Sequence, residues 1–129
     1  MRLSCKIVKN YINNNSFDYA NEWIIRAGEP NTLYFQLVDL DQNNLRYMPT
    51  NAPIAVSVIF SSIDDADKIT AIAALADNAD GSIWKIVLSA SQTPKSGNVV
   101  FQISENSVIR KFSVLNAMNV ELVGNDGSC

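Results

Sequence analysis

The sequence contains no histidine and has only two cysteines and five glycines among its 129 residues. Without histidine the chain cannot form a Ser-His-Asp triad, a Cys-His dyad or a histidine-ligated metal site. The few glycines form neither a P-loop nor a dinucleotide-binding pattern. Because the commonest catalytic arrangements are missing, we expect a protein that is not an enzyme and that uses no cofactor.

Carboxylates are the remaining candidates for chemistry, and they cluster in predicted turns. Asp39, Asp41 and Asn43 have the spacing that opens a calcium-binding loop. The glycine and glutamate that complete such a loop are replaced by Asn44 and Thr50. We therefore interpret these acids as turn residues and expect no metal site. The same interpretation applies to two further acidic groups, at residues 64–67 and 77–80.

Charge and hydropathy exclude two more classes of protein. Ten basic and thirteen acidic residues give a net charge of −3, whereas a nucleic-acid-binding protein needs a basic surface. No apolar run approaches the roughly 20 residues that span a bilayer. Met1–Lys9 lacks the continuous hydrophobic region of a signal peptide. We expect no nucleic-acid or membrane partner, and we expect Cys5 and Cys129 to be free thiols.

Alternation of polar and apolar residues dominates the chain, as is typical of half-buried strands. Turn signals recur at a spacing of about 8–12 residues. This pattern predicts an all-β, antiparallel β-sandwich of immunoglobulin-like topology, or a related barrel, with eight or nine short strands. The expected strands are Leu3–Lys9, Thr32–Val38, Leu45–Met48, Ile54–Phe60, Ser82–Leu88, Asn98–Ser104, Ser107–Leu115 and Asn119–Val123, while Trp23–Arg26 is a short apolar segment that ends at Gly28-Glu29-Pro30.

Residues 67–76 are ambiguous between strand and helix. Ile69, Ile72, Ala73 and Ala76 would share a helical face, and alanine favours helix. The same segment also alternates, and the following Asp80-Gly81 suits a hairpin turn. Because the neighbouring segments are all strands, we favour a strand here.

The predicted organisation has three parts. Residues 1–22 form a first strand and an asparagine-rich arm, residues 23–123 form the sandwich, and residues 124–129 form a flexible tail. The stretch Asn10–Asn21 is too long and polar for a hairpin loop, yet it carries several large apolar side chains. We expect an extended arm that packs on its own domain or on a neighbouring subunit.

The aromatic residues divide into two groups. Trp84, Phe60, Phe101 and Phe112 lie on strongly apolar strand faces and are expected in the core. Others are less well placed, so that core packing and a role as interface anchors both remain open. The candidate interface residues are Tyr11, Phe17, Tyr19, Trp23, Tyr34 and Tyr47.

Several segments resemble a known family. They are NEW at 21–23, GEPNTLYFQLVD at 28–39, VSVIF at 56–60, SGNVVF at 96–101 and RKF at 110–112. Between residues 23 and 115 the chain resembles small immunoglobulin-like structural proteins of tailed-bacteriophage virions, such as the N-terminal module of upper baseplate proteins. The resemblance implies a virion component that is present in several copies and has no catalytic residues.

Under this resemblance the partners are other virion proteins and copies of the chain itself, assembled in the bacterial host cytoplasm. The baseplate module continues into a fibre, whereas this sequence stops, which argues against a fibre anchor and favours a neck, tail or decoration subunit that stands alone. We expect a structural subunit of the tail, baseplate or neck. Two alternatives remain open. One is a capsid decoration protein, and the other is a carbohydrate-binding module that uses Trp23, Tyr34 or Tyr47 as a sugar platform.

Overall fold

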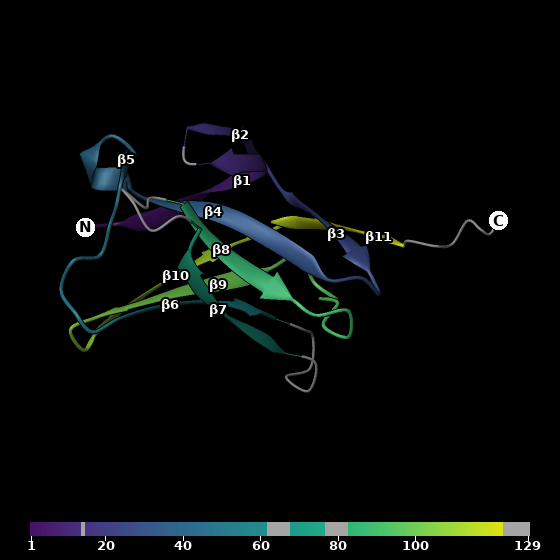
Figure 1. The fold of residues 1–129 in the computed structure, drawn as a ribbon. Helices are drawn as coiled ribbons and strands as arrows, with labels where there is room; N and C mark the ends of the chain where they lie inside the picture. Colours follow the sequence, from purple (N-terminus) through teal and green to yellow (C-terminus); the bar gives the residue numbers. More distant parts are fainter. Residues whose placement is uncertain (14, 62–67, 77–82, 123–129) are drawn as a thin grey trace.

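A computed structural model describes residues 1–13, 15–61, 68–76 and 83–122 of the chain. Within them the regular structure is almost entirely β, with one 3-10 turn, so the predicted all-β fold is confirmed. Two layers of strands face each other across the core (Figure 1). The elements are β1 (Leu3–Asn13), β2 (Ser16–Ala20), β3 (Trp23–Ala27), β4 (Asn31–Asp39), η1 (Leu40–Gln42), β5 (Leu45–Arg46), β6 (Ile54–Phe60), β7 (Ile69–Leu75), β8 (Ile83–Leu88), β9 (Val99–Glu105), β10 (Val108–Val114) and β11 (Met118–Leu122).

One continuous sheet supplies both layers. Its strand order is β10-β9-β6-β7-β8-β4-β1-β2, with β5 beside β4, and each neighbouring pair is antiparallel. The sheet folds over at β7, which pairs with β6 through Ile69–Ala73 and with β8 through Ala74 and Leu75. The upper layer in Figure 1 therefore holds β8, β4, β1 and β2, and the lower layer holds β7, β6, β9 and β10.

A second sheet has two strands, β3 and β11. They pair in parallel, from Met118 opposite Trp23 to Leu122 opposite Ala27. This pair departs from the purely antiparallel arrangement that the sequence predicted. Parallel pairing needs residues far apart in the chain, so alternation within either segment does not reveal it.

The ambiguous segment is strand, as favoured. In β7 the side chains of Ala71 and Ala73 are buried, whereas Ile72 between them is 74 % exposed. Pairing with β6 outweighs the helical preference of alanine, because tertiary context overrides propensities of a few tenths of a kcal/mol per residue. The expected turn at Asp80-Gly81 lies outside the described residues.

The segment expected as an extended arm packs on its own domain, one of the two expected options, but it does so as a hairpin. Ser16–Ala20 returns antiparallel to β1 and forms a hairpin within the domain. Asn10 has a φ of 53° at a register irregularity, and the Asn13 side chain accepts the amide of Asn15 at 2.8 Å. Asparagine tolerates left-handed backbone and forms such local bonds, so the polar residues that suggested a loop instead shape a bulged hairpin.

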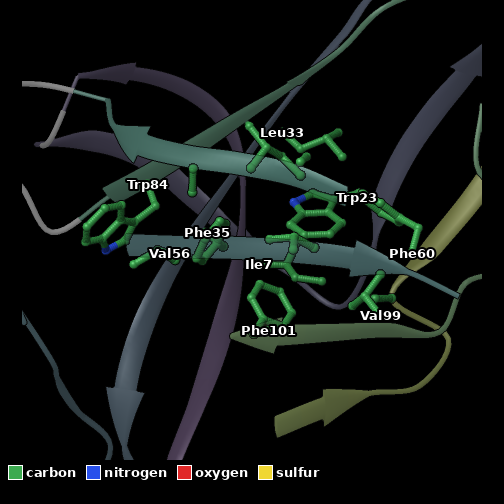
Figure 2. Close-up of a cluster of buried hydrophobic side chains, with 14 of the residues drawn as sticks. Ile7, Trp23, Leu33, Phe35, Val56, Phe60, Trp84, Val99 and Phe101 are labelled. Carbon is green, nitrogen blue, oxygen red and sulfur yellow. The ribbon is translucent and has the colours of Figure 1, made fainter. Parts of the chain in front are cut away.

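The core lies between the two layers and is centred on aromatic rings (Figure 2). Phe35, Phe60 and Phe101 are at most 1 % exposed, and Trp84 is 6 % exposed. The ring of Phe112 is only partly buried but stacks on Phe101 with centroids 4.9 Å apart. The four expected core aromatics thus all contact the core.

Candidate interaction surface

Four of the six candidate interface residues meet on the outer face of the upper layer. Val8 of β1 pairs with Tyr19 of β2 on one side and with Tyr34 of β4 on the other. Phe17 lies two residues before Tyr19 and therefore shares its face. Tyr11 joins them from beyond the bulge. We call Tyr11, Phe17, Tyr19 and Tyr34 the outer aromatic cluster.

Ring contacts hold this cluster together. Tyr11 stacks on Tyr34 with centroids 4.5 Å apart, and Phe17 meets Tyr19 edge to face at 5.4 Å. In an unbroken strand Tyr11 would face away from Val8, since neighbouring side chains alternate. The irregularity at Asn10 shifts that alternation and turns the ring of Tyr11 onto the outer face.

Tyr19 is the most accessible member of the cluster. Its side chain is 50 % exposed, its hydroxyl donates to Gln36 Oε1 at 2.9 Å, and Lys6 Nζ lies 4.8 Å from its ring centre. A tyrosine ring held in this way offers apolar area and a polar tip with little conformational entropy left to lose. Ile12 in the same hairpin is 75 % exposed, and Ile24 just after it is 49 % exposed.

Trp23 is a core residue and not a surface anchor. It is 3 % exposed, and its indole N–H donates to the carbonyl oxygen of Tyr34 at 2.8 Å. Its ring lies 6.1 to 6.3 Å from those of Phe35, Phe60 and Phe101. Trp23 follows a polar segment in the sequence, which suggested a peripheral position. The parallel pairing of β3 with β11 covers this part of the chain.

Tyr47 lies apart from the cluster and binds a buried carboxylate. Its hydroxyl donates to Glu105 Oε1, while the amides of Thr50 and Asn51 donate to Oε2 at 2.9 and 3.0 Å. Arg110 adds a guanidinium 3.9 Å away. Glu105 is only 5 % exposed, so these contacts fasten the segment between β5 and β6 to the end of β9.

The contacts of this buried group shift two pKa values in opposite directions. The hydrogen bond from Tyr47 and those from the two amides lower the pKa of Glu105, against the effect of burial. Burial, followed by the bond to Glu105, raises the pKa of Tyr47 to about 12. The arrangement stabilises the ionised carboxylate of Glu105 and keeps the hydroxyl of Tyr47 protonated. The hydrogen bond between the two side chains is therefore maintained.

Sequence reasoning missed Glu105, although its signal was present. Val99, Phe101 and Ile103 alternate with polar or less apolar residues along their strand and face inward, and Glu105 continues that alternation. A charged residue on an inward face is almost always paired when buried, so the pattern itself indicated a partner. Its identity required the structure, since Tyr47 is 58 positions away.

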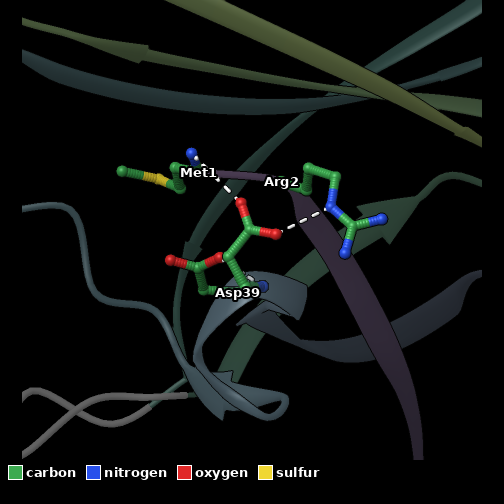
Figure 3. Close-up of polar contacts among 4 residues, drawn as sticks. Met1, Arg2 and Asp39 are labelled. Carbon is green, nitrogen blue, oxygen red and sulfur yellow. Dashed lines mark hydrogen bonds and ion pairs between the residues drawn. The ribbon is translucent and has the colours of Figure 1, made fainter.

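The acids of the suspected calcium loop are turn residues, as predicted. Asp39 Oδ1 accepts the amide of Asp41 at 3.0 Å and caps η1. Asp41 in turn accepts Arg2 Nε at 2.8 Å and lies 3.3 Å from the amino group of Met1 (Figure 3). The bond to Arg2 lowers the pKa of Asp41. This exposed ion pair contributes little to stability.

The described part of the chain holds neither a candidate metal site nor a helix that could cross a membrane. Residues 1–13, 15–61, 68–76 and 83–122 contain no group of three or more histidine, cysteine, aspartate or glutamate side chains that could hold a metal ion. Over the same ranges, no helix is long and apolar enough to cross a membrane. The acidic groups at 64–67 and 77–80 and the expected tail at 124–129 lie outside these ranges.

No protein-family model matches the chain, and no curated protein matches it.

Proposed function

We propose that this chain is a non-catalytic subunit of a larger assembly and acts through protein–protein contacts. The observation that carries the proposal is the outer aromatic cluster beside an edge strand. β2 ends the sheet order, and an edge strand presents backbone donors and acceptors to a partner. Tyrosine and phenylalanine are enriched at protein interfaces, and the hairpin that carries three of the four cluster residues also exposes the side chain of Ile12.

The assembly that we propose is the virion of a tailed bacteriophage, at its tail, baseplate or neck. Support comes from the segments that resemble small immunoglobulin-like virion proteins and from the β-sandwich fold that accompanies them. A capsid decoration protein of the same fold remains the alternative location. The partners would be other virion proteins and further copies of the chain.

The carbohydrate-binding alternative has lost part of its basis. Trp23, one of its three platform residues, lies in the core, and Tyr47 is engaged by Glu105. Tyr34 stacks on Tyr11. A flat, accessible sugar platform made from these three residues is therefore not formed.

Solution mass tests the assembly role. Size-exclusion chromatography with light scattering, under reducing conditions, should show a discrete oligomer. Ile12→Glu should shift it toward monomer, because the new charge would be desolvated at the contact. Ile72→Glu is a matched control, since Ile72 on β7 is 74 % exposed and Ile12 is 75 % exposed. Equal dissociation by the two variants would argue against the hairpin surface.

Antibody labelling tests the virion role. Gold-conjugated antibody should decorate the tails or necks of phage particles purified from the strain whose genome encodes the chain. Labelling of the capsid shell would support the decoration alternative. A monomeric protein that is also absent from such particles would contradict the proposed function.

A further inference from the structure

β1 of the upper layer and β10 of the lower layer lie near each other without pairing. We call the space between these two strands the seam. Six antiparallel pairings connect these strands through the sheet, so both strands point in the same direction. β2 covers the edge of β1 only from Ile7 onward, because Ala20 pairs with Ile7. Among the described residues, no strand pairs with the remaining edge of β1 or with the outer edge of β10.

Two open hollows follow one another along this seam. The first is about 380 Å³ and has Cys5, Lys6, Ile7 and Val114 in its lining, with Tyr19, Ala20 and Asn21 at the end of β2. The second is about 420 Å³ and lies between residues 1–3 and 110–111. In both hollows the lining residues of β1 and β10 are separated by the same offset in sequence number. The two hollows therefore follow one another along the strands, about four residues apart.

The backbone of β10 offers hydrogen-bonding groups to this seam. Asn106 and Ser107 have φ values of 48° and 69° and form a two-residue turn between Glu105 and Val108. Glu105 and Val108 are therefore a hydrogen-bonded pair, and the pairs alternate from there. It follows that Lys111 and Ser113 point their amide and carbonyl groups away from β9, toward the seam.

Side chains along the seam alternate in character. Cys5, Ile7 and Val114 face inward and pack against the core. Lys6 and Lys111 lie on the opposite faces of their strands, and Arg2 and Arg110 also line the second hollow. Among the described residues lining the two hollows, four are basic and none is acidic. This contrasts with the net charge of −3 of the whole chain. Arg2 and Arg110 already face Asp41 and Glu105, so Lys6 and Lys111 supply the positive charge for a partner.

From this geometry we infer that the seam binds an extended, acidic segment of a partner protein, which adds to β10 as an antiparallel strand. Its backbone bonds to Lys111 and Ser113. Its inward side chains are apolar and enter the hollows, and its outward side chains are acidic and face Lys6 and Lys111. This inference rests on the proposed function, and it specifies the chemistry of the partner.

A synthetic peptide tests the inference on the full-length chain. The probe is a seven-residue peptide that alternates glutamate with valine, and the control replaces each glutamate with lysine. Titration followed by NMR should shift the amides of residues 3–7 and 110–114, with affinity falling as salt rises. The lysine peptide should not bind.

Variants of β10 separate backbone pairing from charge. Ser113→Pro removes the amide that faces the seam and should abolish binding, whereas Ser113→Ala keeps that amide and should bind normally. Lys111→Glu should weaken binding roughly tenfold, equivalent to 1.4 kcal/mol. Arg46→Glu on β5 makes the same charge change away from the seam and should have no effect. Circular dichroism confirms that each variant is folded.

Three results would overturn the inference. They are no saturable binding of the glutamate peptide, shifts confined to residues outside the seam, and a dimer whose contact occupies the seam and excludes the peptide. If the glutamate peptide does not bind while Ile12→Glu still dissociates the oligomer, only the inference about the seam is contradicted. If only the oligomer test fails, binding of the glutamate peptide still stands as an independent result.

Discussion

At the scale of single residues, burial decides what each polar group does. Glu105 and Asp41 both lie near an arginine, at 3.9 and 2.8 Å. Only Glu105 is buried and has backbone amides and a tyrosine hydroxyl around it. A buried charge that loses its partners is costly, so the end of the sandwich depends on Glu105 far more than on the exposed Asp41.

The stability of the fold should depend on the ionisation of Glu105. Because its pKa is lower in the folded chain than in the unfolded one, its contribution is present above the unfolded pKa and is lost as pH falls through the folded pKa. Glu105→Gln should lower the free energy of unfolding by about 1–3 kcal/mol at pH 7. The difference from the parent chain should shrink toward pH 3 in urea titrations.

Glu22→Gln is the control for this prediction, because it removes a carboxylate at an exposed position. It should leave the free energy of unfolding within about 0.5 kcal/mol of the parent. A Glu105→Gln variant whose deficit persists unchanged at pH 3 would show that the carboxylate acts through packing and not through its charge.

At the scale of elements, turns determine which side chains face outward. Asn10 bends the first hairpin so that Tyr11 reaches Tyr34, while Asn106 and Ser107 join β9 to β10 without an irregularity. The strands expected at Asn98–Ser104 and Ser107–Leu115 leave only two residues for a connection here, and the structure places the turn one residue later than this spacing predicts. The bulge was not predicted, because an asparagine in left-handed backbone is as common in loops as in bulges.

The turn between β9 and β10 should become more stable when glycine replaces Ser107. A left-handed conformation costs a non-glycine residue roughly 1 kcal/mol, and Ser107 has a φ of 69°. Ser107→Gly creates the preferred Asn-Gly turn and should raise the free energy of unfolding by about 0.5–1 kcal/mol.

Ser113→Gly provides the contrast within the same hairpin. Ser113 lies in the middle of β10, where glycine gains no favourable backbone conformation and loses entropy on folding. Thermal unfolding should place this variant below the parent and Ser107→Gly above it. The reverse order would mean that the turn residues do not adopt these left-handed conformations.

At the scale of the whole molecule, the packing of the two layers controls access to Cys5. This thiol is free, lies between the layers near Val114, and has its pKa raised to about 12 by burial. Since the thiolate is the reactive form, iodoacetamide should modify Cys5 slowly at pH 8 in the folded chain. A Cys129→Ser background makes Cys5 the single thiol.

Mass spectrometry would follow that modification, with the same reaction in urea as its reference. Modification should be at least about tenfold slower in the folded chain, since a pKa near 12 leaves little thiolate at pH 8. The glutamate–valine peptide should slow it further by filling the hollow that Cys5 lines. Equal rates of Cys5 modification in the folded and unfolded chains would contradict the burial of this thiol between the layers.

The sequence by itself determined most of the strands and the alternation of their side chains, including β7 despite its alanines, but not β2, which was expected within an arm, or β3. It also brought six aromatic residues forward as interface candidates, of which the structure groups four on one face: Tyr11, Phe17, Tyr19 and Tyr34. These properties are local, because a strand repeats every two residues wherever it lies. Their role at an interface remains a prediction.

Only the tertiary structure decided which faces are covered and which strands pair across long distances. It placed Trp23 in the core, built a hairpin from the expected arm and joined β3 to β11 in parallel. It also gave Glu105 its partners. The reason is physical: burial and pairing depend on residues far apart in the chain, and period-two alternation carries no information about which distant segment provides the cover.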